Sequence, residues 1–229
     1  MAIFAIGDLH LSLGTDKPMD IFGGNWDNYI ERILDGFKIV SDDDTVVLCG
    51  DLTWSMTLDG SINDFDFIDK LPGSKIILKG NHDYWWSTVS KANSFFQKNG
   101  FHTLSVLHNN SFFVEDISIC GTRGWFYDEA TGGDQDKKVM LREIARLEAS
   151  LLSADNGGEK VCFLHYPPLY NNYVCEEILA LFKKYSVREC FYGHIHGHGH
   201  RRAITGLVGG VNYRMVSADY LNFVPERVR

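Results

Sequence analysis

The chain has 229 residues, of which 45% are hydrophobic and 23% are charged, and its formal net charge is −8 at pH 7. This length allows one large α/β domain or two small ones around a substantial core. The acidic balance and the lack of a long basic run disfavour a dedicated nucleic-acid-binding protein.

The first half of the chain alternates short apolar runs with amphipathic stretches. Three runs are predicted to be buried strands, the last leading into a polar loop: residues 2–6, 45–51 and 75–83. Three stretches have helical spacing: residues 26–40, 61–71 and 87–98. Asn25 is available as the cap of the first helix, and Ser61 with Asp64 resembles a capping arrangement for the second. Pro72 and Gly100 are expected to stop the second and third helices.

The second half begins with shorter runs. Residues 103–121 predict adjacent antiparallel strands. Further strands are expected near 160–168, 188–194, 204–209 and 211–217, and helices over 135–153 and 175–185. The region of Gly132 and Gly133, before the long helix, is expected to be a mobile lid segment. The alternation of strand and helix predicts a largely parallel sheet with helices on its faces, and the hairpin-like parts predict a second set of strands.

The N-terminal apolar run ends after a few residues and has no basic lead-in, so we expect neither a signal peptide nor a membrane span. We therefore expect a cytoplasmic protein without a membrane partner. The five cysteines are widely spaced and form no C-x-x-C pair: Cys49, Cys120, Cys162, Cys175 and Cys190. This pattern predicts reduced thiols and argues against disulfides or a thiolate zinc site.

Five predicted strands end in polar clusters: GDLH (7–10), GD (50–51), GNHD (80–83), LHYPP (164–168) and GHIH (193–196). In open α/β sheets, ligands bind beyond the carboxyl ends of the strands, so we expect these clusters to converge although they span most of the chain. The glycines within them are expected to permit tight turns and to let the backbone approach an ion.

The residue types of these clusters indicate a metal site. Carboxylates, an amide oxygen and imidazoles, without thiolate, suit divalent cations such as Mn²⁺, Fe²⁺ or Zn²⁺. The donors are too many for one tetrahedral ion, which takes about four ligands. Two ions that share one carboxylate would use all of these donors. A pair of divalent ions about 3.5–4 Å apart is the usual arrangement in enzymes that catalyse nucleophilic displacement at phosphorus.

The chain resembles the calcineurin-like metallophosphoesterase superfamily, whose pattern D-x-H, GD, GNH-[DE], H and GH-x-H is met in order over residues 7–196. The resemblance implies one domain over residues 1–229, an α/β fold of two mixed sheets packed as a sandwich and flanked by helices. It also implies two divalent metal ions. One would be bound by Asp8, His10 and His196, the other by Asn81, His165 and His194, with Asp51 bridging them.

The resemblance further implies that His82 protonates the leaving oxygen, a role that imidazole suits near neutral pH. A hydrogen bond within the loop is the alternative role for His82. Asp83 is predicted to orient His82 or a metal ligand, with an ordinary turn carboxylate as the alternative. Arg123 could bind a substrate phosphate bidentately, or it could be a surface residue on a loop packed by aromatic side chains.

Four other histidines fall outside the pattern. His198 and His200 follow the GH-x-H motif, and we expect them in a loop near the site entrance. His102 and His108 are expected at the surface or at strand ends, without a role.

The activity implied is hydrolysis of a phosphate ester by a metal-bridging hydroxide, without a covalent protein intermediate. We expect a phosphomonoesterase that acts on a phosphorylated small molecule or protein. A phosphodiesterase on cyclic nucleotides or other diesters is the alternative, and the acidic charge disfavours a nuclease. A third possibility is a non-catalytic scaffold on the same fold, but scaffolds lose the acid histidine or several ligands, whereas this chain keeps them all. Residue order predicts neither the metal's identity nor an oligomeric state.

Overall fold

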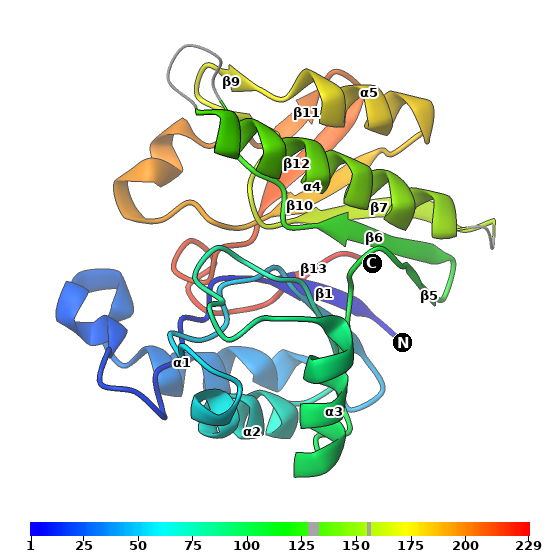
Figure 1. Ribbon diagram of the computed structural model, residues 1–229. Helices are drawn as coiled ribbons and strands as arrows, with labels where there is room; N and C mark the ends of the chain where they lie inside the picture. Colours follow the sequence, from blue (N-terminus) through cyan, green and yellow to red (C-terminus); the bar gives the residue numbers. More distant parts are fainter. Residues whose placement is uncertain (128–132, 155–156) are drawn as a thin grey trace.

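The computed structural model describes residues 1–127, 133–154 and 157–229. Two mixed β-sheets pack face to face, and helices cover the outer face of each sheet (Figure 1). The predicted fold class, a sandwich of two sheets flanked by helices, is therefore confirmed.

The first sheet has five strands in the order β13-β1-β2-β3-β4. They are β1 (Ile3–Ile6), β2 (Thr45–Leu48), β3 (Ser74–Ile77), β4 (Leu104–Val106) and β13 (Glu226–Arg227). Strands β1 to β4 pair in parallel, and β13 pairs antiparallel to β1. The connecting helices lie on the outer face: α1 (Tyr29–Gly36), α2 (Ile62–Lys70) and α3 (Val89–Asn99) (Figure 1).

The second sheet has six strands in the order β11-β12-β10-β7-β6-β5. They are β5 (Phe112–Val114), β6 (Ile117–Thr122), β7 (Glu159–Leu164), β10 (Glu189–Tyr192), β11 (Gly206–Val208) and β12 (Val211–Met215). The inner four strands are parallel, and both edge strands are antiparallel. The outer face carries α4 (Asp134–Ser153) and α5 (Glu176–Lys184), and a small hairpin joins β8 (Leu169–Tyr170) to β9 (Tyr173–Val174).

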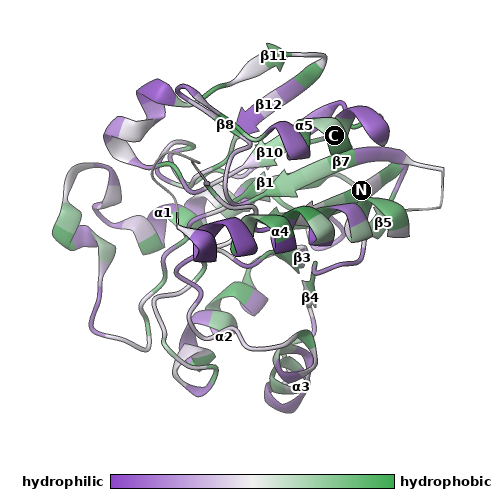
Figure 2. Ribbon diagram, turned by 45° about the horizontal axis from the view of Figure 1, so that its top comes forward, coloured by the Kyte–Doolittle hydropathy of each residue, from purple (hydrophilic) through white to green (hydrophobic). Residues whose placement is uncertain are grey.

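The core forms three apolar layers because side chains alternate across each strand. In β1, Ile3 and Ala5 face the second sheet, whereas Phe4 and Ile6 face the helices of the first sheet. Figure 2 shows the central strands β1, β7 and β10 in hydrophobic colours. Burial on both faces explains why these strands read as unbroken apolar runs in the sequence.

The strand pairing predicted for residues 103–121 is wrong in part. Strand β4 pairs in parallel with β3 in the first sheet, and only β5 and β6 form the expected antiparallel pair. The chain changes sheets between β4 and β5. Short apolar runs do not distinguish a hairpin from such a crossover, because the strand partner depends on contacts distant in sequence.

Two predicted helix caps are also wrong. Asn25 lies in a separate 3₁₀ turn, and α1 begins after Asn28. The Ser61 hydroxyl donates to the Leu58 carbonyl and does not cap α2. Gly100, in contrast, adopts the left-handed conformation that ends α3, as predicted.

The carboxyl ends of the parallel strands gather at one edge of the sandwich, where the two sheets are joined. Gly7, directly after β1, pairs in parallel with Ser217, which follows β12. The Gly7 N–H donates to the Val216 carbonyl at 2.7 Å, and the Gly7 carbonyl accepts from the Ala218 N–H at 3.0 Å. This junction brings the loops that follow the strands of both sheets into one place.

All five cysteines are buried with free thiols. Among the described residues, no helix is both long enough and apolar enough to cross a membrane. Gly132, in the lid segment expected before the long helix, lies outside the described residues.

Candidate two-metal site

Two triads of side chains meet at this edge: Asp8, His10 and His196, and Asp51, His165 and His194. Within each triad, one donor atom from each residue lies within 4.8 Å of the others. Asn81 joins the second triad, because its Oδ1 is 2.7 Å from His165 Nε2. The structure thus brings together all seven side chains that the sequence proposed as ligands.

The spacing of the donor atoms fits divalent cations. His10 Nε2 is 3.2 Å from His196 Nε2, and His165 Nε2 is 3.2 Å from His194 Nδ1. Nitrogen atoms bound to one cation at about 2.1 Å lie roughly 3.0–3.4 Å apart in octahedral or tetrahedral geometry. Two imidazole lone pairs at this separation repel each other unless a proton or a cation lies between them, so each triad is suited to hold one metal ion.

Asp51 lies between the triads. Its Oδ2 is 3.4 Å from His165 Nε2 and 3.9 Å from His10 Nε2, so one carboxylate reaches both groups. Its Oδ1 accepts from the His82 backbone N–H at 2.7 Å. Burial alone would raise the pKa of Asp51, but His165 holds it well below its usual value. A charged carboxylate in this position suits a bridging ligand.

The loops that carry the triads have strained backbone conformations. Asp8, His10, Asp51 and His194 all have positive φ angles, of 60°, 45°, 53° and 73°. Each such residue costs about 1–3 kcal/mol unless the surroundings enforce it. Here the Asp8 N–H donates to the Gly50 carbonyl at 2.8 Å, and the His10 N–H donates to the Asp51 carbonyl at 3.0 Å. These bonds tie the loop after β1 to the loop after β2.

Two glycines make room for the carboxylates. A Cβ at Gly80 would lie 2.0 Å from Asp51 Oδ1, and a Cβ at Gly193 would lie 2.5 Å from Asp8 Oδ2. The sequence predicted that glycines here let the backbone approach an ion. At these two positions, the group that needs the space is a neighbouring carboxylate.

Hydrogen bonds fix the orientation of two imidazoles. His165 Nδ1 lies 3.0 Å from the Cys49 carbonyl, and His196 Nδ1 lies 2.9 Å from Asp219 Oδ1. Because these acceptors take the proton on Nδ1, Nε2 of each ring is left with its lone pair facing the site. The third ring, His10, stacks on Trp54 at 4.9 Å between ring centroids.

Asp219 is a site residue that the sequence analysis missed. It follows β12, and besides His196 it accepts from the Gly197 N–H at 3.0 Å. Burial lowers the pKa of His196, but without a bound cation Asp8 and Asp219 raise it to about 10. A cation that binds at Nε2 must therefore displace the proton there. The sequence did contain a signal for Asp219. It is a carboxylate that follows the strand predicted over 211–217, just as the other site residues follow their strands.

Substitution Asp219→Ala is expected to weaken Mn²⁺ binding about 10–100-fold, because the His196 ring loses the acceptor that orients it. Activity titrated against Mn²⁺ checks this, and excess Mn²⁺ should restore most of the rate. A titration midpoint equal to that of the unmodified protein would show that Asp219 does not position His196.

His82 lies beside the triads. Its ring packs against Trp54 at 4.5 Å between centroids, and its Nδ1 is 3.2 Å from the Tyr84 hydroxyl. Burial lowers its pKa from the usual value. The contact with Tyr84 leaves Nε2 as the ring atom that can serve a substrate.

Asp83 does not contact the His82 ring. Its carboxylate accepts from the backbone N–H groups of Asp51, Leu52 and Gly80, at 2.7–3.0 Å, and from Trp85 Nε1 at 2.9 Å. The orienting role predicted for it therefore applies to the backbone of Asp51 and not to His82. Burial, followed by repulsion from Asp51, raises the pKa of Asp83 to about 6.

Arg123 has a protein partner where the sequence suggested a phosphate. Its Nη2 donates to Glu143 Oε1 at 3.2 Å, and its guanidinium lies 4.6 Å from the Trp125 ring centroid. The side chain is only 16% exposed, so Arg123 is not a free surface residue.

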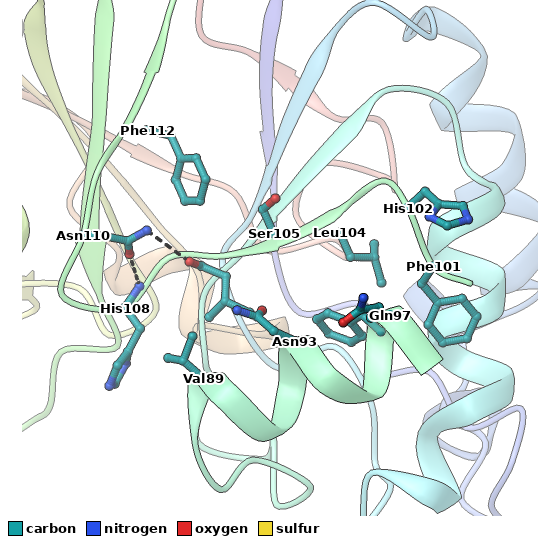
Figure 3. A pocket seen from close by; sticks show the side chains of 12 residues that line it. Val89, Asn93, Gln97, Phe101, His102, Leu104, Ser105, His108, Asn110 and Phe112 are labelled. Carbon is teal, nitrogen blue, oxygen red and sulfur yellow. Dashed lines mark hydrogen bonds between the residues drawn. The ribbon is translucent and has the colours of Figure 1, made fainter. Parts of the chain in front are cut away.

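The remaining histidines occupy two places. His198 and His200 lie in a 3₁₀ turn, Gly197–Arg202, directly after His196. His102 and His108 line a groove of about 650 Å³ formed by α3, β4 and β5 (Figure 3). In that groove the His108 N–H donates to Asn110 Oδ1 at 2.6 Å. The residues that line the groove include no member of either triad.

Comparison with known proteins agrees with this geometry. The family model described as Calcineurin-like phosphoesterase matches residues 1–198. No curated protein matches the chain. Asp219 lies beyond the matched residues.

Solved structures share the fold at low sequence identity. Phosphopantetheinyl Hydrolase from Mycobacterium tuberculosis is 15% identical with a TM-score of 0.61, covering 99% of this chain and 95% of that chain. A protein of unknown function from Aquifex aeolicus is 16% identical with a TM-score of 0.51, with coverage of 99% and 95%. A Thermus thermophilus protein, TT1561, is 13% identical with a TM-score of 0.51, with coverage of 92% and 86%.

Proposed function

The chain belongs to the calcineurin-like phosphoesterase family and is a metal-dependent phosphoesterase, and we propose that it hydrolyses phosphate monoesters with His82 as the general acid. The substrate would be a phosphorylated small molecule or protein. One observation carries the proposal: two ligand triads lie side by side, and Asp51 Oδ2 reaches a histidine of each, at 3.4 and 3.9 Å.

The roles of the residues follow from their positions. Asp8, His10 and His196 would hold one divalent cation, and Asn81, His165 and His194 the other, with Asp51 shared. Two such cations would activate water for attack and offset the charge that develops on the phosphoryl oxygens. Mn²⁺, Fe²⁺ and Zn²⁺ suit this donor set.

His82 would complete the reaction. As water adds to phosphorus and the ester bond breaks, the proton on His82 Nε2 passes to the leaving oxygen, which departs as an alcohol. Because burial lowers the pKa of His82, the bound phosphate's negative charge is needed to favour the imidazolium form. Trp54 would restrict the ring's motion, because it contacts both His82 and His10.

A substrate panel in Mn²⁺ tests this proposal. We expect p-nitrophenyl phosphate to be hydrolysed with a higher kcat/KM than bis-p-nitrophenyl phosphate. Phosphopeptides and sugar phosphates are then the next substrates to test. Preference for the diester would instead indicate a phosphodiesterase, for which cyclic nucleotides and a phosphopantetheinyl ester are the next substrates. If no ester in the panel is hydrolysed, the result would favour a non-catalytic scaffold.

A further inference from the structure

A buried carboxylate on α4 is shared by two arginines. Glu143, on α4, is 2% exposed, and its Oε1 accepts from Arg123 Nη2 at 3.2 Å and from Arg146 Nη1 at 2.6 Å. Its Oε2 accepts from the Thr122 hydroxyl at 2.6 Å. Both oxygens are thus used, and one negative charge faces two guanidinium groups.

This group has two cations around one buried carboxylate, in a chain whose net charge is −8. Partly buried charges are normally paired, so the group carries an excess of positive charge.

One donor atom in this group is buried without a partner among the described residues: Nε of Arg123. The outer face of the Arg123 guanidinium is covered by the Trp125 ring at 4.6 Å. A guanidinium held on one side by a carboxylate and on one face by an aromatic ring is pre-organised, so little side-chain entropy is lost when it binds a further anion.

The group borders the proposed metal site. The Arg123 carbonyl accepts from the backbone N–H groups of His165, at 3.2 Å, and Tyr166, at 2.8 Å. Arg123 is therefore joined through its backbone to His165, one of the proposed metal ligands.

We propose that Arg123 and Arg146, gathered around Glu143, form a second anion site that binds a phosphate group of the substrate other than the one that is hydrolysed. We call these three residues the Glu143 cluster. This inference rests on the proposed function and narrows its substrate class to phosphate monoesters that carry a second phosphate a few carbon atoms away.

Turnover of matched substrates tests the inference. We expect α,ω-alkanediol bisphosphates of three to six carbons to exceed the matching monophosphates in kcat/KM by roughly tenfold at the best length, mainly through KM. Arg146→Gln should remove most of this preference. Arg142→Gln is the matched control, because Arg142 lies on the same helix but is exposed, and among the described residues its side chain donates to the Lys138 carbonyl alone.

A binding measurement separates this inference from the proposed function. Calorimetric titration of the Mn²⁺-loaded protein with inorganic phosphate should show two sites in the unmodified protein and in Arg142→Gln, but one site in Arg146→Gln. If p-nitrophenyl phosphate is not hydrolysed and the second site is present, the proposed function fails and the Glu143 cluster stands as an anion site. If Arg146→Gln and Arg142→Gln give the same phosphate sites and the same bisphosphate preference, the cluster is only a structural ion network and the inference is wrong.

Discussion

Substitution His82→Asn is expected to lower kcat on an alkyl phosphate by about 10²–10⁴-fold while Mn²⁺ binding is retained. The imidazole lies beside the triads, against Trp54 and the Tyr84 hydroxyl, and is not a member of either triad. Asparagine keeps the backbone N–H that donates to Asp51 Oδ1, so the shared carboxylate keeps its support. The substitution removes the proton donor together with the ring's contacts with Trp54 and Tyr84.

The measurement that isolates this role is a comparison of leaving groups. An alkyl alcohol leaves poorly without a proton, whereas p-nitrophenolate leaves well, so the variant should lose far more activity on the alkyl ester. His198→Asn is the matched control, since His198 is an exposed histidine two residues beyond the site and should change kcat by less than about twofold. Equal losses on both substrates would mean that His82 acts by packing or binding and not by donating a proton.

The convergence of the site could be predicted because it depends on a simple rule. Parallel strands place their carboxyl ends at one edge, so polar residues that follow β1, β2, β3, β7 and β10 must lie near one another. This convergence depends on local pattern and on the direction of strands. The strand pattern also predicted a largely parallel sheet with a second set of strands, whereas the packing of two sheets as a sandwich was implied by the family resemblance.

The parts that sequence did not predict depend on partners distant along the chain. Asp64, read as part of a helix cap, instead accepts from the Leu13 N–H at 2.7 Å and from the Thr53 hydroxyl. Asp219 lies 23 residues from His196, and Arg123 lies 20 residues from Glu143. A short motif does not encode which of several carboxylates a given side chain will meet, because that choice is made by the packing of whole elements.

The carboxylate between the triads gives the other large expected effect. Substitution Asp51→Asn should abolish stabilisation by Mn²⁺ and lower activity at least about 10³-fold, because breaking a buried charge interaction costs about 3–5 kcal/mol. In the unmodified protein, Mn²⁺ at 100 times its Kd should add about 2.7 kcal/mol per site to the free energy of unfolding. For a chain of this size, that is a rise in Tm of roughly 5–11 °C for one site.

A thermal melt with and without Mn²⁺ therefore tests the two-metal site without any substrate. Asp59→Asn is the matched control, since Asp59 follows the same strand but is exposed, and its melt should respond to Mn²⁺ like that of the unmodified protein.

The size of the Tm shift distinguishes the loss of one ion from the loss of both. A variant that still binds one ion should keep about half of the Mn²⁺-induced rise in Tm, whereas a variant that binds neither should keep none of it. Since Asp51 Oδ2 lies within 3.9 Å of a histidine from each triad, we expect the response to both ions to disappear together. A full Mn²⁺ response in Asp51→Asn would mean that each triad binds its cation alone and that Asp51 is not shared.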